Sequence, residues 1–510
     1  MHHILCGLAA NPALPSELVD RLISLADEDI AMDLACRADL SGAQAVALAG
    51  RIDESAMQLA YAGRLTSADI DPSVWPDAAL ALLDQGLGRP EWANLLATDP
   101  VRERREKLAA CHGLPSEVVD TLAADPDVRV VAELSLWATS DVAERLAAHP
   151  HAEVRRAVAG NKATPPAALA ALVTGEGLSA TRRCLVCDRE EIPFVHDPQC
   201  PRLDCELPSG ASCDGSHEST VHAMWEAALR NPATPTETVV GFVDHPSMLL
   251  RWALAARQDL PPQIFTRLAS DPVPGVRADL AENPAIDDAL IRALAGDRDP
   301  EVRRRLAHHP RVPLDVLTRL AGNTRIGATL LPRIAAASPA EVEELAKSPD
   351  PTVRMLVCQR RNLRPDIRDR LVDDPDAKVV KALAPHPGLT GSQLRAMVDR
   401  HGVQVLAKVA ANPDAPAALL EDLVRYEPAA RRVYREVARH RRATAPALLI
   451  CLADKRARPV AAGHPALPPS VIAKLLSDAD CQVVEAAAAN PSLPPALMSD
   501  LLFRHERATR

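Results

Sequence analysis

Aromatic residues are scarce in this chain of 510 residues, where five Trp, three Tyr and four Phe make up only 2%. Large globular cores ordinarily take much of their buried area from aromatic side chains. We therefore expect the chain to bury Ala, Leu and Val in many small interfaces rather than in one large core. No apolar run approaches the roughly 18 residues that a membrane span needs. The N-terminal residues do not resemble a signal peptide, so we expect a cytoplasmic protein that does not enter a membrane.

Negative charge exceeds positive charge in the whole chain, with 68 Asp and Glu against 58 Lys and Arg. The net charge is -10 and the pI is about 5.9, which disfavours nucleic acid as a partner of the whole surface. The few aromatics disfavour base stacking for the same partner. The chain has no Gly-rich phosphate loop, no His-Glu-x-x-His and no Gly-x-Ser-x-Gly, which are signatures of common catalytic sites. We therefore predict that the protein is not an enzyme.

An internal repeat dominates what is present. The phrase Asn-Pro-Ala-Thr-Pro at 231–235 has close copies that begin at Asn11, Asn412, His464 and Asn490. If the first residue of each phrase is called the anchor, looser copies bring the total to eighteen units, spaced 24 to 28 residues apart except for one longer gap. The anchors are Asn11, Arg37, Gly63, Leu87, Cys111, Leu136, Asn161, Asn231, Gln258, Asn283, His309, Ala335, Arg361, His386, Asn412, His440, His464 and Asn490.

Each unit carries two helix-start signals. The position four residues after the anchor is Pro in eleven units, and is Ser, Thr, Asp or Glu in the others. Pro suits the first turn of a helix, and Ser, Thr and Asp suit its N-cap. About ten residues later a second signal follows, as in Asp299-Pro300 and Asp350-Pro351. Two short helices per unit of about 25 residues cannot bury their apolar faces alone, so the pattern predicts an all-α stack of repeats.

The unit Asn-Pro-x-x-Pro, followed by Leu positions and then Asp-Pro-x-x-Val-Arg, resembles the leucine-rich repeat variant of bacteria. The resemblance covers nearly the whole chain outside 180–222. It implies alternating α- and 3-10 helices stacked in a right-handed superhelical solenoid. The predicted organisation is N-terminal repeats over 1–179, a cysteine-rich module over 180–222 and C-terminal repeats over 223–510.

Arg and His recur at fixed places in this repeat. The Arg that follows Val forms a column, which is either an anion-binding stripe or a structural ladder in which each Arg pairs with an Asp of a neighbouring repeat or with helix carbonyls. We favour the ladder. The column comprises Arg129, Arg155, Arg251, Arg277, Arg303 and Arg354. His at an anchor is expected to bond to the backbone of its turn, as Asn does there.

The longer gap between Asn161 and Asn231 holds a segment rich in Cys, Pro and Gly, with almost no apolar core of its own. A metal bound by thiolates can supply the folding free energy that such a segment lacks. The candidate ligands are Cys184, Cys187, Cys200, Cys205, Cys213 and His217. A Cys-x-x-Cys pair followed by a second Cys pair is typical of a Cys₄ zinc site, and thiolates also hold iron–sulfur clusters.

Two resemblances favour the cluster. Some leucine-rich repeat variant proteins carry a cysteine-ligated [4Fe–4S] module, which implies Cys184, Cys187, Cys200 and Cys205 as ligands. The run from Cys213 to His217 reads Cys-Asp-Gly-Ser-His and is similar to the CDGSH motif, which implies Cys213 and His217 as ligands of a [2Fe–2S] cluster. We favour an iron–sulfur cluster, [4Fe–4S] before [2Fe–2S], with Zn²⁺ as the alternative.

One stretch, 425–458, is locally basic although the whole chain is acidic. It is either a solvated face or a patch for an anion or a partner. The candidate residues are Arg431, Arg432, Arg435, Arg439, Arg441 and Arg442. The predicted function is a repeat scaffold that binds a protein partner and carries a structural or redox-responsive metal centre. A nucleic-acid-binding protein that uses this patch, and an iron–sulfur redox protein, are the alternatives.

Overall fold

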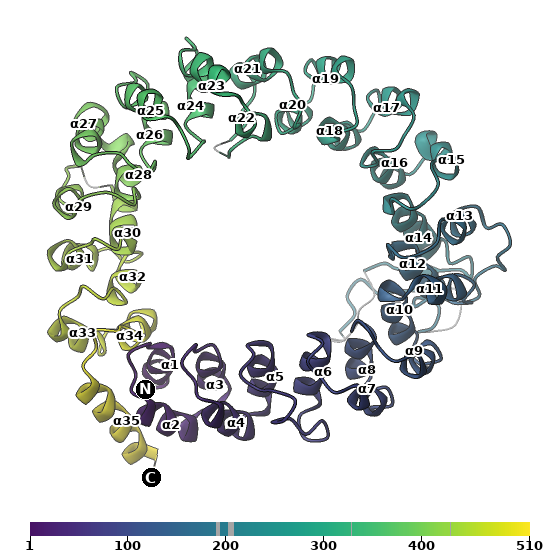
Figure 1. Cartoon of the computed structure of the whole chain (residues 1–510), viewed down its shortest axis with the longest axis horizontal. Coiled ribbons are helices and arrows are strands. Elements are labelled where there is room, and N and C mark those ends of the chain that lie inside the picture. Colours follow the sequence, from purple (N-terminus) through teal and green to yellow (C-terminus); the bar gives the residue numbers. More distant parts are fainter. Residues whose placement is uncertain (190–193, 202–208, 328, 429, 510) are drawn as a thin grey trace. The chain divides into compact units, whose positions relative to one another are not determined.

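The computed structural model describes residues 1–189, 194–201, 209–327, 329–428 and 430–509. Their regular secondary structure is almost entirely α-helical, with one two-stranded antiparallel hairpin, so the predicted all-α repeat fold is confirmed (Figure 1). The chain packs as two compact units. Unit 1 comprises Met1–Ile70 and Gly327–Arg510, and unit 2 comprises Asp71–Ile326.

The elements of unit 1 are α1 His2–Ala10, α2 Ser16–Leu25, α3 Glu28–Ala35, α4 Gly42–Arg51, α5 Asp53–Tyr61, α22 Pro332–Ala335, α23 Pro339–Ala346, α24 Pro351–Val357, α25 Pro365–Val372, α26 Ala377–Leu383, α27 Gly391–His401, η2 Gly402–Gln404, α28 Leu406–Ala410, α29 Ala417–Val424, α30 Arg431–Arg439, α31 Ala445–Cys451, α32 Arg458–Ala462, α33 Pro469–Leu475, α34 Cys481–Ala488 and α35 Pro495–Thr509. The elements of unit 2 are α6 Pro76–Asp84, α7 Pro90–Leu96, α8 Arg102–Ala109, α9 Ser116–Ala123, α10 Val128–Trp137, α11 Ser140–Leu146, α12 Ala152–Gly160, α13 Pro166–Thr174, β1 Phe194–Val195, β2 Ser212–Cys213, α14 Glu218–Arg230, α15 Thr236–Val239, η1 Val240–Asp244, α16 Met248–Ala255, α17 Pro262–Leu268, α18 Pro274–Glu282, α19 Asp288–Leu294, α20 Pro300–Leu306 and α21 Leu314–Asn323.

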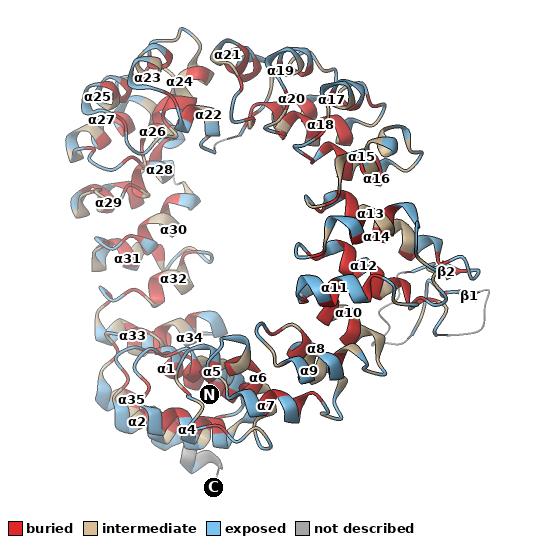
Figure 2. Cartoon of the chain, turned by 45° about the vertical axis from the view of Figure 1, so that its right-hand side comes forward, coloured by how far each residue is buried: buried red, intermediate tan, exposed pale blue. Residues whose placement is uncertain are grey.

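The helices of each unit form two layers. In unit 2, α10, α12, α14, α16, α18 and α20 stack in succession, and in unit 1 the sequence α30, α32 and α34 does the same. Buried residues lie on the helix faces that meet neighbouring helices, and exposed residues lie on the opposite faces (Figure 2). Each short helix is thus stabilised by the repeats before and after it, as expected of a solenoid.

The helix-start signals behave largely as predicted. Pro262 occupies the first turn of α17, and Ser41 and Thr390 close capping boxes at α4 and α27. One start is wrong: Ser67 begins no helix, because the residues around it form turns in which Asp69 accepts hydrogen bonds from the backbone and hydroxyl of Thr66. These local bonds compete with a helical backbone.

The anchors form a ladder of hydrogen bonds between successive repeats. The Asn412 amide donates to the carbonyl oxygens of Ala384 and His386 at 2.6 and 2.7 Å, and its oxygen accepts the backbone N–H of Asp414 at 2.8 Å. Asn161, Asn231, Asn283 and Asn490 repeat this arrangement with their own preceding repeats. Each bond satisfies carbonyls that would otherwise be buried without a partner, which costs about 1–3 kcal/mol per group.

In some repeats an Arg makes the anchor bonds, and in two of them it lies one residue before the anchor predicted from the sequence. Arg257 donates to the carbonyls of Leu229 and Asn231 at 3.2 and 3.0 Å, so the anchor of that repeat is Arg257 and not Gln258. In the same way Arg360, not Arg361, donates to the preceding repeat. The guanidinium of Arg reaches the same carbonyls of the preceding repeat as the amide of Asn does. The bonds between repeats are therefore kept in these units although the Asn-Pro sequence is absent.

A second difference concerns helix type. The expected alternation of α- and 3-10 helices is not found: in the described residues, 3-10 helix occurs as the two segments η1 and η2. The second helix of most repeats has seven to ten α-helical residues, because an Asp cap and a following run of Val, Leu and Ala support a full α-helical turn. Asp299 and Asp350, for example, cap α20 and α24 through their side chains.

The Arg column proves to be mainly a structural ladder. Arg277 reaches Asp297, twenty residues ahead, with Nε–Oδ2 and Nη2–Oδ1 distances of 2.7 and 2.9 Å, and both side chains are less than 10% exposed. Arg251–Asp271 and Arg354–Asp374 repeat the bidentate pair. Arg155 and Arg303 instead donate mainly to backbone carbonyls. Removing one partner of a buried pair leaves an uncompensated charge, so these Arg side chains are committed to the fold.

The two ends of the chain meet inside unit 1, which the sequence did not predict. Helix α1 packs against α34, and the Asn11 amide donates to the carbonyls of Ala488 and Asn490, both at 2.8 Å (Figure 1). The first repeat therefore continues the ladder from the last one. The Arg21 guanidinium also lies 3.6 Å from the ring centroid of Phe503, on α35.

Anchor His residues predict a pH dependence of stability. Burial lowers the pKa of His309, His386 and His464 below the usual value, and His309 Nε2 donates to the Asn283 carbonyl while Nδ1 accepts the Arg311 N–H. This arrangement needs the neutral ring. Below pH about 6.5 the unfolded chain binds protons that the folded chain excludes, so we expect the free energy of unfolding to fall with pH in that range.

Chemical denaturation between pH 7.5 and 5.5 measures this effect. The variant with all three His replaced by Asn is the control, because Asn makes the same bonds at other anchors without titrating. We expect its stability to depend less on pH than that of the native chain. An equal pH dependence in both would contradict the assignment.

Candidate metal centre

A loop module interrupts the repeats of unit 2 between α13 and α14. It is built of turns and the hairpin of β1 and β2, in which Phe194 pairs with Cys213. Its small core comprises Cys184, Val186 and Cys213, packed on Ala152 at the start of α12. So little apolar surface stabilises a segment of this length weakly, as the sequence predicted.

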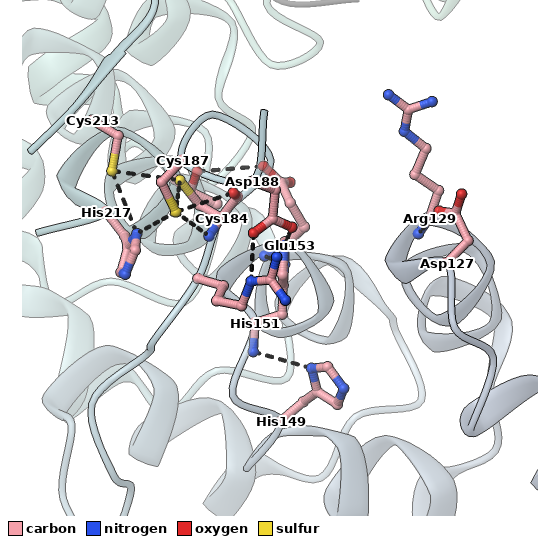
Figure 3. A network of polar contacts seen from close by, with 12 residues as sticks. Asp127, Arg129, His149, His151, Glu153, Cys184, Cys187, Asp188, Cys213 and His217 are labelled. Carbon is pink, nitrogen blue, oxygen red and sulfur yellow. Dashed lines mark hydrogen bonds and ion pairs between the residues drawn. The ribbon is translucent and has the colours of Figure 1, made fainter. Parts of the chain in front are cut away.

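Four side chains of the module converge at one point (Figure 3). Cys184 Sγ lies 3.7 Å from both Cys187 Sγ and Cys213 Sγ, and His217 Nδ1 lies 3.7 Å from Cys187 Sγ and 3.5 Å from Cys213 Sγ. All four ligand atoms lie within 4.8 Å of one another, close enough to bind one metal ion.

Backbone geometry favours thiolates at this point. The Cys184 N–H points at Cys187 Sγ at 3.2 Å, and the Gly215 N–H at Cys213 Sγ at 3.4 Å. His217 takes a left-handed conformation with φ of 55°, immediately before α14, which turns its ring toward the sulfurs. Burial raises the pKa of the Cys184 thiol to about 12. A buried thiolate is costly unless a cation compensates its charge.

The module is fastened to the repeats by one buried histidine and short backbone contacts. His151 caps α12 by accepting the Glu153 N–H at Nδ1, and its Nε2 lies 3.0 Å from the Asp188 carboxylate, next to Cys187. Arg183 pairs with the same carboxylate at 2.6 Å, and its carbonyl accepts the Ala152 N–H. Figure 3 shows the contacts of His149 with His151 and of His151 with Asp188, beside the cluster of sulfurs. The position of the cysteines is therefore coupled to the start of α12.

The predicted ligands divide into three groups. Cys184, Cys187, Cys213 and His217 form the cluster. Cys200 is half-buried in a turn, with its N–H donating to the Asp197 carbonyl, and is not part of that cluster. Cys205 lies outside the described residues. The Cys-Asp-Gly-Ser-His run thus supplies the second pair of ligands, which the Cys spacing alone assigned to Cys200 and Cys205.

The predicted basic residues lie on or next to α30 in unit 1. Arg431, Arg432 and Arg435 line a cavity of about 500 Å³ together with Lys455 and Arg456. The remaining three, Arg439, Arg441 and Arg442, are exposed, and Arg442 donates to the carbonyl of Asp414. Sequence reasoning did not single out Lys455 and Arg456 as partners of these arginines, although both fell inside the basic stretch.

No family model and no curated protein matches the chain. A solved leucine-rich repeat variant is similar at 21% identity and a TM-score of 0.27, over 53% of this chain and 88% of that one. Importin beta is similar at 13% identity and a TM-score of 0.22, over 98% of this chain and 64% of that one. SYS-1 is similar at 10% identity and a TM-score of 0.15, over 94% and 93%. The chain is a helical-repeat protein with a candidate metal centre.

Among the described residues, the helices are all too short or too polar to cross a membrane.

Proposed function

We propose that this chain is a non-enzymatic repeat scaffold that binds a protein partner, and that it carries one structural zinc ion held by Cys184, Cys187, Cys213 and His217. The closed donor set carries the proposal. Three thiolates and one imidazole fill the four positions of a tetrahedral zinc ion, whereas catalytic zinc keeps one position open for water or substrate. A filled set supports a structural role.

Distances support a single zinc ion over a [4Fe–4S] cluster. With Zn–S bonds of about 2.3 Å and a Zn–N bond of about 2.0 Å, tetrahedral geometry separates two sulfurs by about 3.8 Å and sulfur from nitrogen by about 3.5 Å. The sulfur pairs at 3.7 Å and the sulfur–nitrogen pairs at 3.5 and 3.7 Å fit one ion. The four ligands of a [4Fe–4S] cluster bind four different irons and are separated by the whole cluster.

The repeats support the scaffold half of the proposal. Their buried Arg, Asn and His side chains bond one repeat to the next and stabilise the stack. The exposed side chains are not needed for these bonds, so they can vary from helix to helix and form a specific binding surface. Repeat stacks commonly use such extended surfaces to bind partners.

Metal analysis and reconstitution test the two halves. We expect one zinc per chain, no visible colour, and a tetrahedral absorption spectrum after exchange with cobalt. Iron with acid-labile sulfide, bleached by dithionite, would instead support the redox alternative. To test the scaffold function, the full chain is used to capture candidate partner proteins. Each candidate is then produced recombinantly and titrated against the full chain, and we expect at least one of them to form a saturable complex. Failure of every recombinant candidate to bind would reject the scaffold function.

A further inference from the structure

Five cations surround one cavity of unit 1. Arg431, Arg432 and Arg435 project from α30, and Lys455 and Arg456 come from the turn that precedes α32; all five are exposed. The acidic residues that line this cavity of about 500 Å³ are Glu436 and Asp454. Two adjacent repeats thus place an excess of positive charge around one space.

A second cavity extends this surface across the preceding repeats. It measures about 430 Å³, shares Arg431, Arg432 and Glu436 with the first, and adds Lys381 of α26 and Lys408 of α28. Its lining also includes apolar atoms of Val403, Ala407, Ala411 and Ala430. We call the two cavities together the basic groove. It presents seven cations on four successive repeats, beside a small apolar strip.

These cations differ from the other arginines of the repeat. Arg277 and Arg354 are held by Asp in the next repeat, whereas within the described residues no hydrogen bond or ion pair engages the guanidinium groups of Arg431, Arg432 and Arg435. Like charges that crowd together destabilise a folded chain. The repulsion is relieved when an anionic ligand lies among them.

The lining favours one class of anion. No aromatic side chain is among the described residues that line the groove, so it offers no stacking platform for the bases of single-stranded nucleic acid. Val403 is 49% exposed and lies in the same cavity as Lys408. An aliphatic side chain of a ligand can cover Val403 while neighbouring carboxylates meet the cations.

We propose that the basic groove binds an extended acidic segment of a partner protein, with Asp and Glu side chains on its cations and an aliphatic side chain on Val403. The proposal rests on the scaffold function and names the chemistry of the partner. Charge complementarity of this kind mainly sets the association rate and the choice of partner.

A fluorescein-labelled peptide of Glu and Asp residues with two Leu tests the groove by fluorescence anisotropy with the full chain. We expect saturable binding that weakens by about tenfold or more in Arg431→Glu/Arg432→Glu. Arg145→Glu/Arg267→Glu is the matched control, because it makes the same change in net charge at exposed arginines already paired with Asp, and should bind as the native chain does. Val403→Asp should weaken the Leu-containing peptide more than one with Gly in place of Leu.

Equal affinity of the peptide for the native chain and for Arg431→Glu/Arg432→Glu would overturn the proposal. Tighter binding of an oligothymidine of the same length, lost in that variant, would overturn it in favour of nucleic acid. If a recombinant partner binds Arg431→Glu/Arg432→Glu as tightly as the native chain, the groove assignment fails while the scaffold function stands. If no recombinant partner binds the native chain, the scaffold function itself fails.

Discussion

Replacing Cys184 by Ser is expected to abolish zinc binding and to loosen the module between α13 and α14, while the repeats stay folded. Cys184 is 1% exposed, and its sulfur lies 3.7 Å from the sulfurs of Cys187 and Cys213. Binding of a structural zinc supplies about 10–16 kcal/mol of folding free energy in small modules. A serine hydroxyl is a poor zinc ligand, so most of that free energy is lost.

Two variants serve as controls for the zinc prediction. Cys111→Ser changes a buried repeat thiol that contacts only the Lys107 carbonyl among the hydrogen bonds described, and it should retain one zinc. Cys200→Ser should also retain zinc, because Cys200 is not in the cluster. Zinc content by mass spectrometry and limited proteolysis of the module measure the outcome. Loss of metal in Cys200→Ser as well as in Cys184→Ser would return Cys200 to the ligand set, as the Cys spacing predicted.

The metal centre illustrates what a sequence can and cannot give. The Cys-x-x-Cys pair and the instability of its loop were readable in the sequence, because both depend on neighbouring residues. The presence of Cys213 and His217 in the cluster, and not of Cys200, depends on the β1–β2 hairpin, which pairs Phe194 with Cys213. The spacing of the Cys residues along the sequence does not predict this strand pairing. The five-residue Cys-Asp-Gly-Ser-His match did indicate Cys213 and His217, although as ligands of a [2Fe–2S] cluster separate from the four Cys of the spacing.

The repeats show the same division. Their period, helix starts and Arg–Asp ladder follow from short-range patterns that recur along the chain. The anchor role of Arg257 was missed because a different side chain satisfies the same carbonyls at a position one residue earlier. The packing of α1 on α34 was missed because it joins residues about 480 positions apart and has no local signature.

Gly7 on α1 makes that junction testable. A Cβ atom at this position would clash with the Glu485 carbonyl oxygen and lie 2.7 Å from the Ala488 Cβ, whereas a Cβ at Gly50 on α4 meets nothing within 4 Å. Ala is a better helix former than Gly by about 1 kcal/mol. Gly50→Ala should therefore raise the free energy of unfolding slightly. Gly7→Ala should lower it by about 2 kcal/mol, because backbone must move to relieve the overlap.

The opposite signs of the two Gly→Ala effects are the diagnostic, measured by denaturant unfolding. Since the clash lies between α1 and α34, Gly7→Ala should also speed amide hydrogen exchange in both helices, although they stand at opposite ends of the sequence. Exchange in α8 of unit 2 should stay unchanged. A repeat stack with free ends would expose an apolar face at each of them, and the α1–α34 contact covers both faces at once. Faster exchange in α1 alone would mean that α34 does not depend on the first repeat.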